Sequence, residues 1–353
     1  MINRRTFNKA MGLGTGAAAV SLAGLQGVAD ASTAPSRSGK APVVPTVVPG
    51  THTSFPTLKQ VKAGVLNVGY AELGPAHGPV VICLHGWPYD IHSYVDVAPL
   101  LAAEGYRVVV PYLRGHGTTR FLSARSFRNA QQSVIALDII ALMDALKIPE
   151  AVIAGFDWGS RTGDILAALW PGRVKALVSV SGYLITNRKA QLDPIPAAAE
   201  HTWWYQYYFA TERGKKAMED KAHRHELTRL VWNIVSPTWN FDDATFERTA
   251  AAFENPDYPA IVVHNYRWRL SLAEGERRYD RYEDKLALAP AITVPTITLD
   301  PARDPFTAPG NGSAYRSKFT GKYEHRTLSG IGHNLPQEAP TAFAQAVVDV
   351  DHF

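Results

Sequence analysis

Short apolar runs, rich in β-branched residues, alternate with helix-like stretches along this chain. They cover residues 79–85, 107–112, 150–156, 174–181 and 295–299. A strand that is apolar at every position is buried on both faces, so helices must cover both sides of its sheet. We therefore predict an α/β fold with a mostly parallel central sheet, to which Tyr323–Leu328 adds a last strand.

This alternation is interrupted over residues 184–289. The stretch holds seven of the fifteen tyrosines and five of the eight tryptophans, has helix-like polar periodicity and lacks a comparable strand. Strand and helix order resumes near residue 295, so we predict a helical lid inserted into a discontinuous core of residues 58–183 and 290–353. Residues 32–57 are rich in Pro, Ser and Thr and are predicted to form a linker or a surface wrap.

The first 31 residues resemble a twin-arginine export signal. Arg4 and Arg5 precede an uncharged Ala- and Gly-rich run, which ends in the cleavage-like sequence Ala29-Asp30-Ala31. Asparagine before the arginine pair and at position 8 departs from the usual pattern, and a membrane anchor is the alternative. We expect a bacterial protein that the twin-arginine machinery exports, already folded, to the periplasm or beyond.

Charge and cysteine content exclude other classes of protein. Without residues 1–31, which carry three basic residues and one acidic residue, the net charge falls from +4 to 4 − 3 + 1 = +2. This charge does not predict nucleic-acid binding. The single cysteine, Cys83, lies in an apolar run and is expected to be a small core residue.

The run at 152–156 leads into the pattern Gly-x-Asp-x-Gly, formed by Gly155, Asp157 and Gly159. It resembles the nucleophile elbow of α/β hydrolases, with aspartate in the place of serine. A carboxylate can displace a leaving group at a saturated carbon and form an ester, which water then hydrolyses. The following helix, from Trp158 toward Trp170, should direct its positive N-terminal end at the carboxylate. The alternative is an ordinary strand-to-helix turn capped by an aspartate.

A base and an acid follow the elbow in the hydrolase order. His333, in a Gly-His turn after the last predicted strand, is the expected base that activates water. Asp304 follows the strand at 295–299 by a few residues and is expected to orient the imidazole. Asp300 is its rival, and we favour Asp304 because it lies farther beyond the strand end.

Two backbone N–H groups are expected to hold an oxyanion. In the hydrolase layout they belong to Trp87, in the turn His85-Gly86-Trp87-Pro88, and to Trp158 after the nucleophile. His85 is expected to be structural. His116, in Arg114-Gly115-His116-Gly117, has no evident chemical role.

From about Leu58 to the C-terminus the chain resembles the epoxide hydrolases, with dehalogenases as near relatives. The His-Gly-Trp-Pro turn, the Asp-Trp-Gly elbow and the Gly-His loop are shared with much of that group. Two lid segments, 204–209 and 264–267, resemble those that carry the ring-opening tyrosines. The resemblance implies that Tyr205 and Tyr266 polarise an epoxide oxygen, because an alkoxide is a poor leaving group without a proton donor. Trp203, Tyr207 and Tyr208 are expected to pack the lid against the core.

The implied reaction is hydrolysis of a small apolar or aromatic epoxide to a vicinal diol, without cofactor or metal. A haloalkane or haloacid dehalogenase, another hydrolase and a catalytically silent binding protein are the alternatives. Arg161 resembles the second arginine of fluoroacetate-type dehalogenases, and Trp158 stands where those enzymes have the first. Arg161 is therefore expected to contact residues that line the site or to lie on the helix surface. Its presence still leaves open a substrate that bears a carboxylate. The particular epoxide and the oligomeric state are not predicted.

Overall fold

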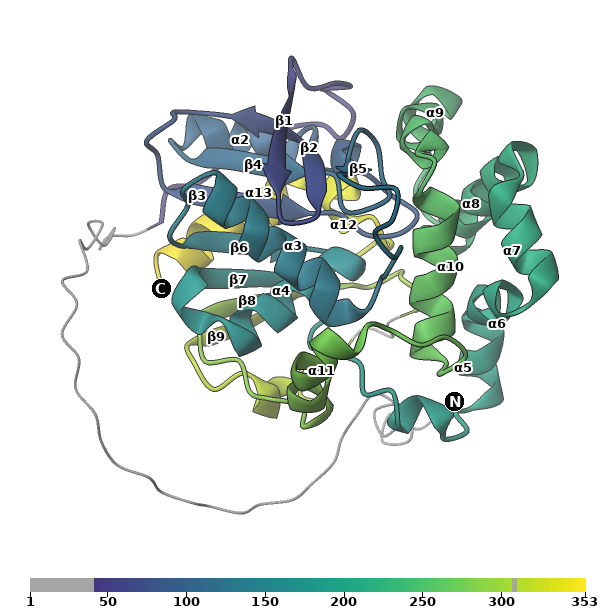
Figure 1. The fold of residues 1–353 in the computed structure, drawn as a ribbon. Helices are drawn as coiled ribbons and strands as arrows, with labels where there is room; N and C mark the ends of the chain where they lie inside the picture. Colours follow the sequence, from purple (N-terminus) through teal and green to yellow (C-terminus); the bar gives the residue numbers. More distant parts are fainter. Residues whose placement is uncertain (1–40, 307–309) are drawn as a thin grey trace, which may run out of the picture.

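A central sheet lies between two layers of helices, and a group of further helices stands beside it (Figure 1). The computed structural model describes residues 41–306 and 310–353. The predicted export signal at residues 1–31 lies outside the described residues.

The sheet has nine strands in the order β1-β2-β4-β3-β6-β7-β8-β9, with β5 paired to β2. The five pairs from β4 to β9 are parallel, and the pairs made by β2 are antiparallel. The strands are β1 (Leu58–Ala63), β2 (Leu66–Leu73), β3 (Val80–Leu84), β4 (Arg107–Pro111), β5 (Arg120–Phe121), β6 (Ala151–Gly155), β7 (Val174–Val180), β8 (Thr296–Pro301) and β9 (Tyr323–Leu328).

The apolar runs form the middle of this sheet, which confirms the predicted fold class. Every residue of β6 and β8 is buried, as expected for strands that are covered on both faces. The sequence did not predict β1 and β2, since β1 is mostly exposed at the sheet edge and lacks an apolar run. β9 is only partly buried because it forms the opposite edge.

Helices cover both faces of the sheet. On one face α2 (Val97–Ala103) packs against α13 (Pro340–Asp351), and on the other α3 (Gln132–Ala145) packs against α4 (Trp158–Leu169), as Figure 1 shows. A short 3-10 helix, η1 (Ile91–Tyr94), contacts α12 (Leu335–Glu338), which also contacts α13.

The chain between β7 and β8 is helical. We call its residues 184–289 the helical region. Figure 1 shows α6 to α10 as a group beside the sheet, with α10 nearest to it. Its helices are η3 (Ala190–Leu192), α5 (Ala197–Thr202), α6 (Trp204–Ala210), α7 (Glu212–Glu219), α8 (Lys221–Val235), α9 (Asp243–Ala250), η4 (Ala251–Glu254), α10 (Tyr258–Arg269), η5 (Arg277–Tyr279) and α11 (Asp280–Ala287). Two more 3-10 helices, η2 (Pro171–Arg173) and η6 (Arg316–Lys318), lie outside this region.

Residues 41–57 run along the surface of the core. The backbone N–H of Val44 donates to Gln345 of α13 at 2.9 Å, and that of Gly50 donates to Asp96 at 2.7 Å. Val44 is buried against the core. Within the described ranges, no helix is long and apolar enough to cross a membrane.

Candidate active site

Asp157 occupies a strained turn between β6 and α4. Its φ of 54° and ψ of −121° lie in a region that side chains other than glycine's rarely adopt. Strain of this kind persists only where the surrounding structure enforces it, and it concentrates at functional sites. The turn projects the carboxylate from the carboxyl end of the central strand β6.

Two glycines permit the close packing that enforces this turn. A Cβ atom on Gly159 would lie 1.9 Å from the carbonyl oxygen of Leu84, and one on Gly155 would lie 2.4 Å from the carbonyl carbon of Gly159. Neither clash is with a flexible side chain, so no other residue fits at these positions. The elbow is thereby held against the end of β3.

Both oxygens of the Asp157 carboxylate are engaged. Oδ1 accepts the backbone N–H of Trp87 at 2.7 Å, and Oδ2 lies 3.3 Å from Nε2 of His333. Burial alone would raise the pKa of Asp157, but His333, the Trp87 N–H and the charge of Arg161 together lower the pKa below its usual value. The carboxylate is therefore ionised in neutral water, as a nucleophile must be.

His333 links this carboxylate to a second one. Its Nδ1 lies 2.7 Å from Oδ2 of Asp304, whose Oδ1 accepts the N–H of Phe306 at 2.8 Å. Burial disfavours the imidazolium, but the carboxylates of Asp304 and Asp157 outweigh burial and raise the pKa of His333 to about 10. The resting site thus holds an imidazolium between two carboxylates.

Asp300, the rival acid, faces another group. It lies in β8, where its Oδ1 accepts the hydroxyl of Tyr315 at 2.7 Å and its Oδ2 lies 3.8 Å from Nε2 of His325. The structure therefore brings Asp157, His333 and Asp304 together and places Asp300 in a separate polar cluster.

Tyr205 of α6 and Tyr266 of α10 form an aromatic cluster with Trp87. Their rings meet edge to face with centroids 5.3 Å apart, and the Trp87 ring lies 5.1 Å from Tyr205 and 5.4 Å from Tyr266. Burial, with the negative charge of Asp157, raises the pKa of both phenols. Both tyrosines therefore keep their protons at neutral pH and can donate them.

The two expected oxyanion donors differ in what they contact. The Trp87 N–H already binds Asp157, whereas Trp158 is the first residue of α4. The first N–H groups of a helix have no acceptor within that helix, so the N–H of Trp158 belongs to this set of open donors. Both groups border the same carboxylate.

The remaining polar residues near the elbow have structural contacts. Nε2 of His85 accepts the N–H of Leu113 at 3.1 Å, and its Nδ1 faces the carbonyl of Gly86 at 3.0 Å. Burial lowers the pKa of His85 and of His116, so both rings are neutral. Arg161 is partly buried and donates from Nε to the carbonyl of Leu184 at 3.1 Å, which shows that it does not face bulk solvent. Tyr207 is 41% exposed, so the expectation that it packs against the core is wrong.

A second layer of contacts around His333 was not predicted. Ser236, at the end of α8, accepts the N–H of His333 at 3.0 Å and donates to Glu338 at 2.7 Å. Glu338 also accepts the N–H of Gly332 at 2.7 Å. Only the position of Glu338, five residues after His333, hints at this arrangement in the sequence. Ser236 is about a hundred residues away and carries no such signal.

No cluster of three or more His, Cys, Asp or Glu that could hold a metal occurs in the part of the chain that the structure describes.

The comparisons with known proteins agree with this geometry. A family model for the α/β hydrolase fold matches residues 79–340. A crystal structure from Klebsiella pneumoniae subsp. pneumoniae, described as a candidate epoxide hydrolase, is 58% identical with a TM-score of 0.82. It covers 85% of this chain, and the match spans 98% of that one. The chain therefore belongs to the α/β hydrolase fold family.

Two curated relatives match over shorter stretches. Epoxide hydrolase B of Mycobacterium tuberculosis is 29% identical over 170 residues, which are 44% of this chain and 47% of the relative. The chain thus spans about half the length of that relative. A haloalkane dehalogenase of Mycobacterium marinum is 28% identical over 58% of this chain and 67% of its own.

The charge network predicts a specific effect of Asp304→Asn. Loss of this carboxylate should lower the pKa of His333 from about 10 toward the ordinary 6.5, as nitrogen-15 NMR of the imidazole can measure. Asp300→Asn is the matched control, because Asp300 accepts from Tyr315 while Nδ1 of His333 faces Asp304. An unchanged titration of His333 in Asp304→Asn would show that another group holds its proton.

The raised pKa of His333 also makes the free energy of unfolding depend on pH. Because the folded-state pKa of His333 is raised, its stabilising contribution is complete below pH 6.5 and is lost as the pH rises through about 10. Between pH 6.5 and 10, the free energy of unfolding should therefore fall more steeply for the wild type than for Asp304→Asn. Denaturant unfolding at several pH values measures the two slopes.

Proposed function

We propose that this protein hydrolyses an epoxide to a vicinal diol through an ester on Asp157. One observation carries the proposal: Asp157 pairs with His333 and accepts the N–H of Trp87, and the ring of the same Trp87 packs against the buried phenols of Tyr205 and Tyr266. A nucleophile for carbon and acids for oxygen are the two requirements for opening a strained ether. The 58% identical structure from Klebsiella pneumoniae, described as a candidate epoxide hydrolase, supports the same reading.

In the first step, a carboxylate oxygen of Asp157 attacks a ring carbon of the epoxide. The ring carbon–oxygen bond breaks, and Tyr205 or Tyr266 gives its proton to the departing oxygen. Oδ2 is the better placed attacker, because Oδ1 is held by the Trp87 N–H at 2.7 Å. The product is an alkyl ester of Asp157 and a tyrosinate.

Formation of the ester releases the base. The ester is neutral, so one of the two carboxylates that hold the proton on His333 disappears, and the pKa of His333 falls. The imidazolium then gives its proton to the tyrosinate. His333 becomes neutral only after the first step and stays oriented by Asp304 at 2.7 Å.

In the second step, neutral His333 takes a proton from water while the hydroxide oxygen attacks the ester carbon. The N–H groups of Trp87 and Trp158 stabilise the resulting oxyanion. Collapse breaks the bond to the alkyl oxygen, which takes the proton from His333 and leaves as the diol. The regenerated carboxyl group of Asp157 then gives its proton to His333, and the resting ion pair is restored.

Dehalogenation is the second candidate, favoured by one observation. The indole Nε1 atoms of Trp87 and Trp158 are buried without a hydrogen-bond partner among the described residues. Indole N–H groups are suitable donors for a departing halide, and a haloalkane dehalogenase is among the relatives. The phenols decide against this candidate, because a halide leaves without a proton.

We also propose that residues 184–289 act as a lid over the site and that residues 1–31 direct export by the twin-arginine route. The lid proposal is supported by Tyr205 and Tyr266, which both come from this region. For export, Arg4→Lys with Arg5→Lys should leave the precursor in the cytoplasm of a bacterial host with this machinery. Cell fractionation with immunoblotting measures the distribution, and equal export of both forms would contradict the route.

His333→Gln should separate the two chemical steps. The variant should react once with styrene oxide and accumulate the alkyl-enzyme, because glutamine cannot activate water. Intact-protein mass spectrometry should show a mass increase equal to one substrate, and peptide mapping should place it on Asp157. Wild-type enzyme in oxygen-18 water should incorporate label into Asp157 after many turnovers.

Two results would contradict this mechanism. Steady turnover by His333→Gln would remove His333 from the hydrolytic step. Label found only in the diol, at full wild-type activity, would mean that water attacks the epoxide directly.

Tyr205→Phe and Tyr266→Phe should each slow alkylation by an epoxide about ten- to a thousand-fold, the effect of losing one positioned acid. Rapid-quench measurement of the first turnover gives this rate. The double variant should be nearly inactive toward epoxides while it retains any activity on haloalkanes.

Tyr207→Phe is the control for this series. Tyr207 lies on the same helix as Tyr205 but is 41% exposed, so its hydroxyl should not affect the rate. Epoxide turnover that survives the double Tyr→Phe change unaltered would refute the role of these tyrosines.

A further inference from the structure

A small pocket beside the proposed reaction centre is lined by two arginines from different parts of the fold. Arg161 comes from α4 of the core and Arg269 from the end of α10, and residues 183–186 with Gln191 complete the lining. The cavity between these residues has a volume of about 30 Å³. This volume holds about two water-sized groups, such as the two oxygens of a carboxylate, and not a whole ligand.

Neither arginine forms an ion pair within the described part of the chain. Nε of Arg161 donates to the Leu184 carbonyl, and Nε of Arg269 is buried without a hydrogen-bond partner. In contrast, Arg114, Arg128 and Arg224 are each paired with a carboxylate. Asp157 attracts Arg161 but forms no ion pair with it. Burying a charge without a contacting partner is costly, so two guanidinium groups in one pocket indicate a missing anion.

The charges around the pocket support this conclusion. No acidic side chain is among its lining residues within the described ranges. Burial, together with the charge of Arg269, lowers the pKa of Arg161 to about 10, so the two cations repel each other. Asp164, near Arg161, does not compensate them, because burial raises its pKa to about 8 and leaves it mostly protonated at neutral pH.

The pocket lies close to the groups that open the epoxide. Arg161 follows Asp157 by one helical turn, and its N–H donates to the Asp157 carbonyl at 3.1 Å. Arg269 follows Tyr266 by nearly one turn of α10, and its guanidinium carbon lies 5.8 Å from the centroid of the Tyr266 ring. Arg161 also lies within electrostatic range of Asp157, Tyr205 and Tyr266, so a group bound between the arginines can belong to the same substrate molecule as the reacting ring.

We propose that Arg161 and Arg269 bind a carboxylate of the substrate, and that the natural substrate is an epoxy acid whose carboxylate lies a few bonds from the ring. This inference rests on the proposed epoxide hydrolysis and names its substrate class. A guanidinium group offers paired N–H donors that match the two oxygens of a carboxylate. The arginines act in binding and positioning, while Asp157, His333 and the tyrosines act on the ring.

The test compares acids with their neutral amides. The probes are 3,4-epoxybutanoate and 4,5-epoxypentanoate, the corresponding epoxyamides, and 1,2-epoxyhexane as a neutral epoxide. For wild-type enzyme we expect kcat/KM to be about 10- to 100-fold higher for the better acid than for its amide, the effect of one or two charge-assisted hydrogen bonds. Most of the difference should lie in KM, because the carboxylate contact is present before and during ring opening.

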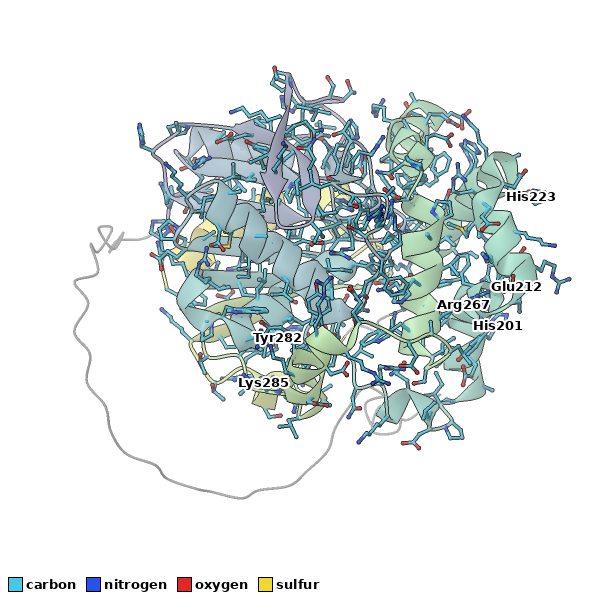
Figure 2. All side chains as sticks on the ribbon, in the orientation of Figure 1. His201, Glu212, His223, Arg267, Tyr282 and Lys285 are labelled. Carbon is cyan, nitrogen blue, oxygen red and sulfur yellow. The ribbon has the colours of Figure 1, made fainter. Side chains whose placement is uncertain are left out.

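Arg269→Gln should reduce this preference to near unity by raising KM for the acid, with turnover of the amide changed only a few-fold. Arg161→Gln should also reduce the preference, and its effect is measured as the ratio of acid to amide because the charge of Arg161 also acts on Asp157. Arg161→Lys is included because Arg161 also holds the Leu184 carbonyl, and lysine keeps the charge. Arg267→Gln is the matched control, since Arg267 lies on the same helix but pairs with Glu212 at 3.0 Å. Figure 2 shows Arg267 and Glu212 beside each other on the helical region.

The outcomes are distinct. The inference is wrong if wild-type enzyme does not prefer the acid, if both Gln variants keep the preference, or if Arg267→Gln abolishes it equally. An equal fall in kcat for acid and amide would overturn it too, since the arginines would then act only on the phenols. If wild-type enzyme opens none of the epoxides, including 1,2-epoxyhexane, the proposed function fails instead. Calorimetric binding of 3,4-dihydroxybutanoate to wild type and Arg269→Gln then decides whether the carboxylate site exists.

Discussion

The buried Asp157 carboxylate is the constraint on which the rest of the site depends. A lone carboxylate in this position would take up a proton or destabilise the fold, because burial removes it from water. The N–H of Trp87 at 2.7 Å and the imidazolium of His333 at 3.3 Å prevent both outcomes. The elbow glycines, the His333 loop and the contacts of Ser236 with that loop serve to keep these partners in place.

The ion pair between Asp157 and His333 also sets the order of the proposed chemical steps. The pairing with His333 keeps Asp157 ionised, and the same pairing, together with Asp304, keeps His333 protonated. A protonated imidazole is not a base. Alkylation removes one of those charges, so the proposed base forms only after the ester has formed. Water is then activated beside an ester and not beside a free epoxide. Asp304 lies 2.7 Å from Nδ1 of His333 and, in the proposed mechanism, orients the imidazole in both steps.

The amino-acid sequence predicts the core of the fold and the series Asp157, His333 and Asp304 better than it predicts the residues around them. Buried strands such as β6 are apolar at every residue, and the position of Asp304 beyond β8 follows from hydrolase order. The sequence does not predict the edge strand β1, because its residues are mostly exposed. The sequence does not predict the contacts of Ser236, Glu338 and Arg269 for a different reason. Each of these residues acts together with one that is distant in sequence or lies on another helix. Tyr207 was misjudged because an aromatic residue next to buried ones can still point outward.

The source of each group suggests how substrate choice and chemistry are divided in this fold. The core supplies the charged chain of Asp157, His333 and Asp304, whose geometry depends on strand ends. The helical region supplies the two phenols and Arg269, and only Arg161 connects the arginine pair to the core. In the proposed mechanism, a change in α6 or α10 can therefore alter which substrate is held and how its oxygen leaves, while ester formation and hydrolysis depend on the core. The Ser236 contact with His333 limits this freedom, because a change at the end of α8 would also affect the loop that carries the imidazole.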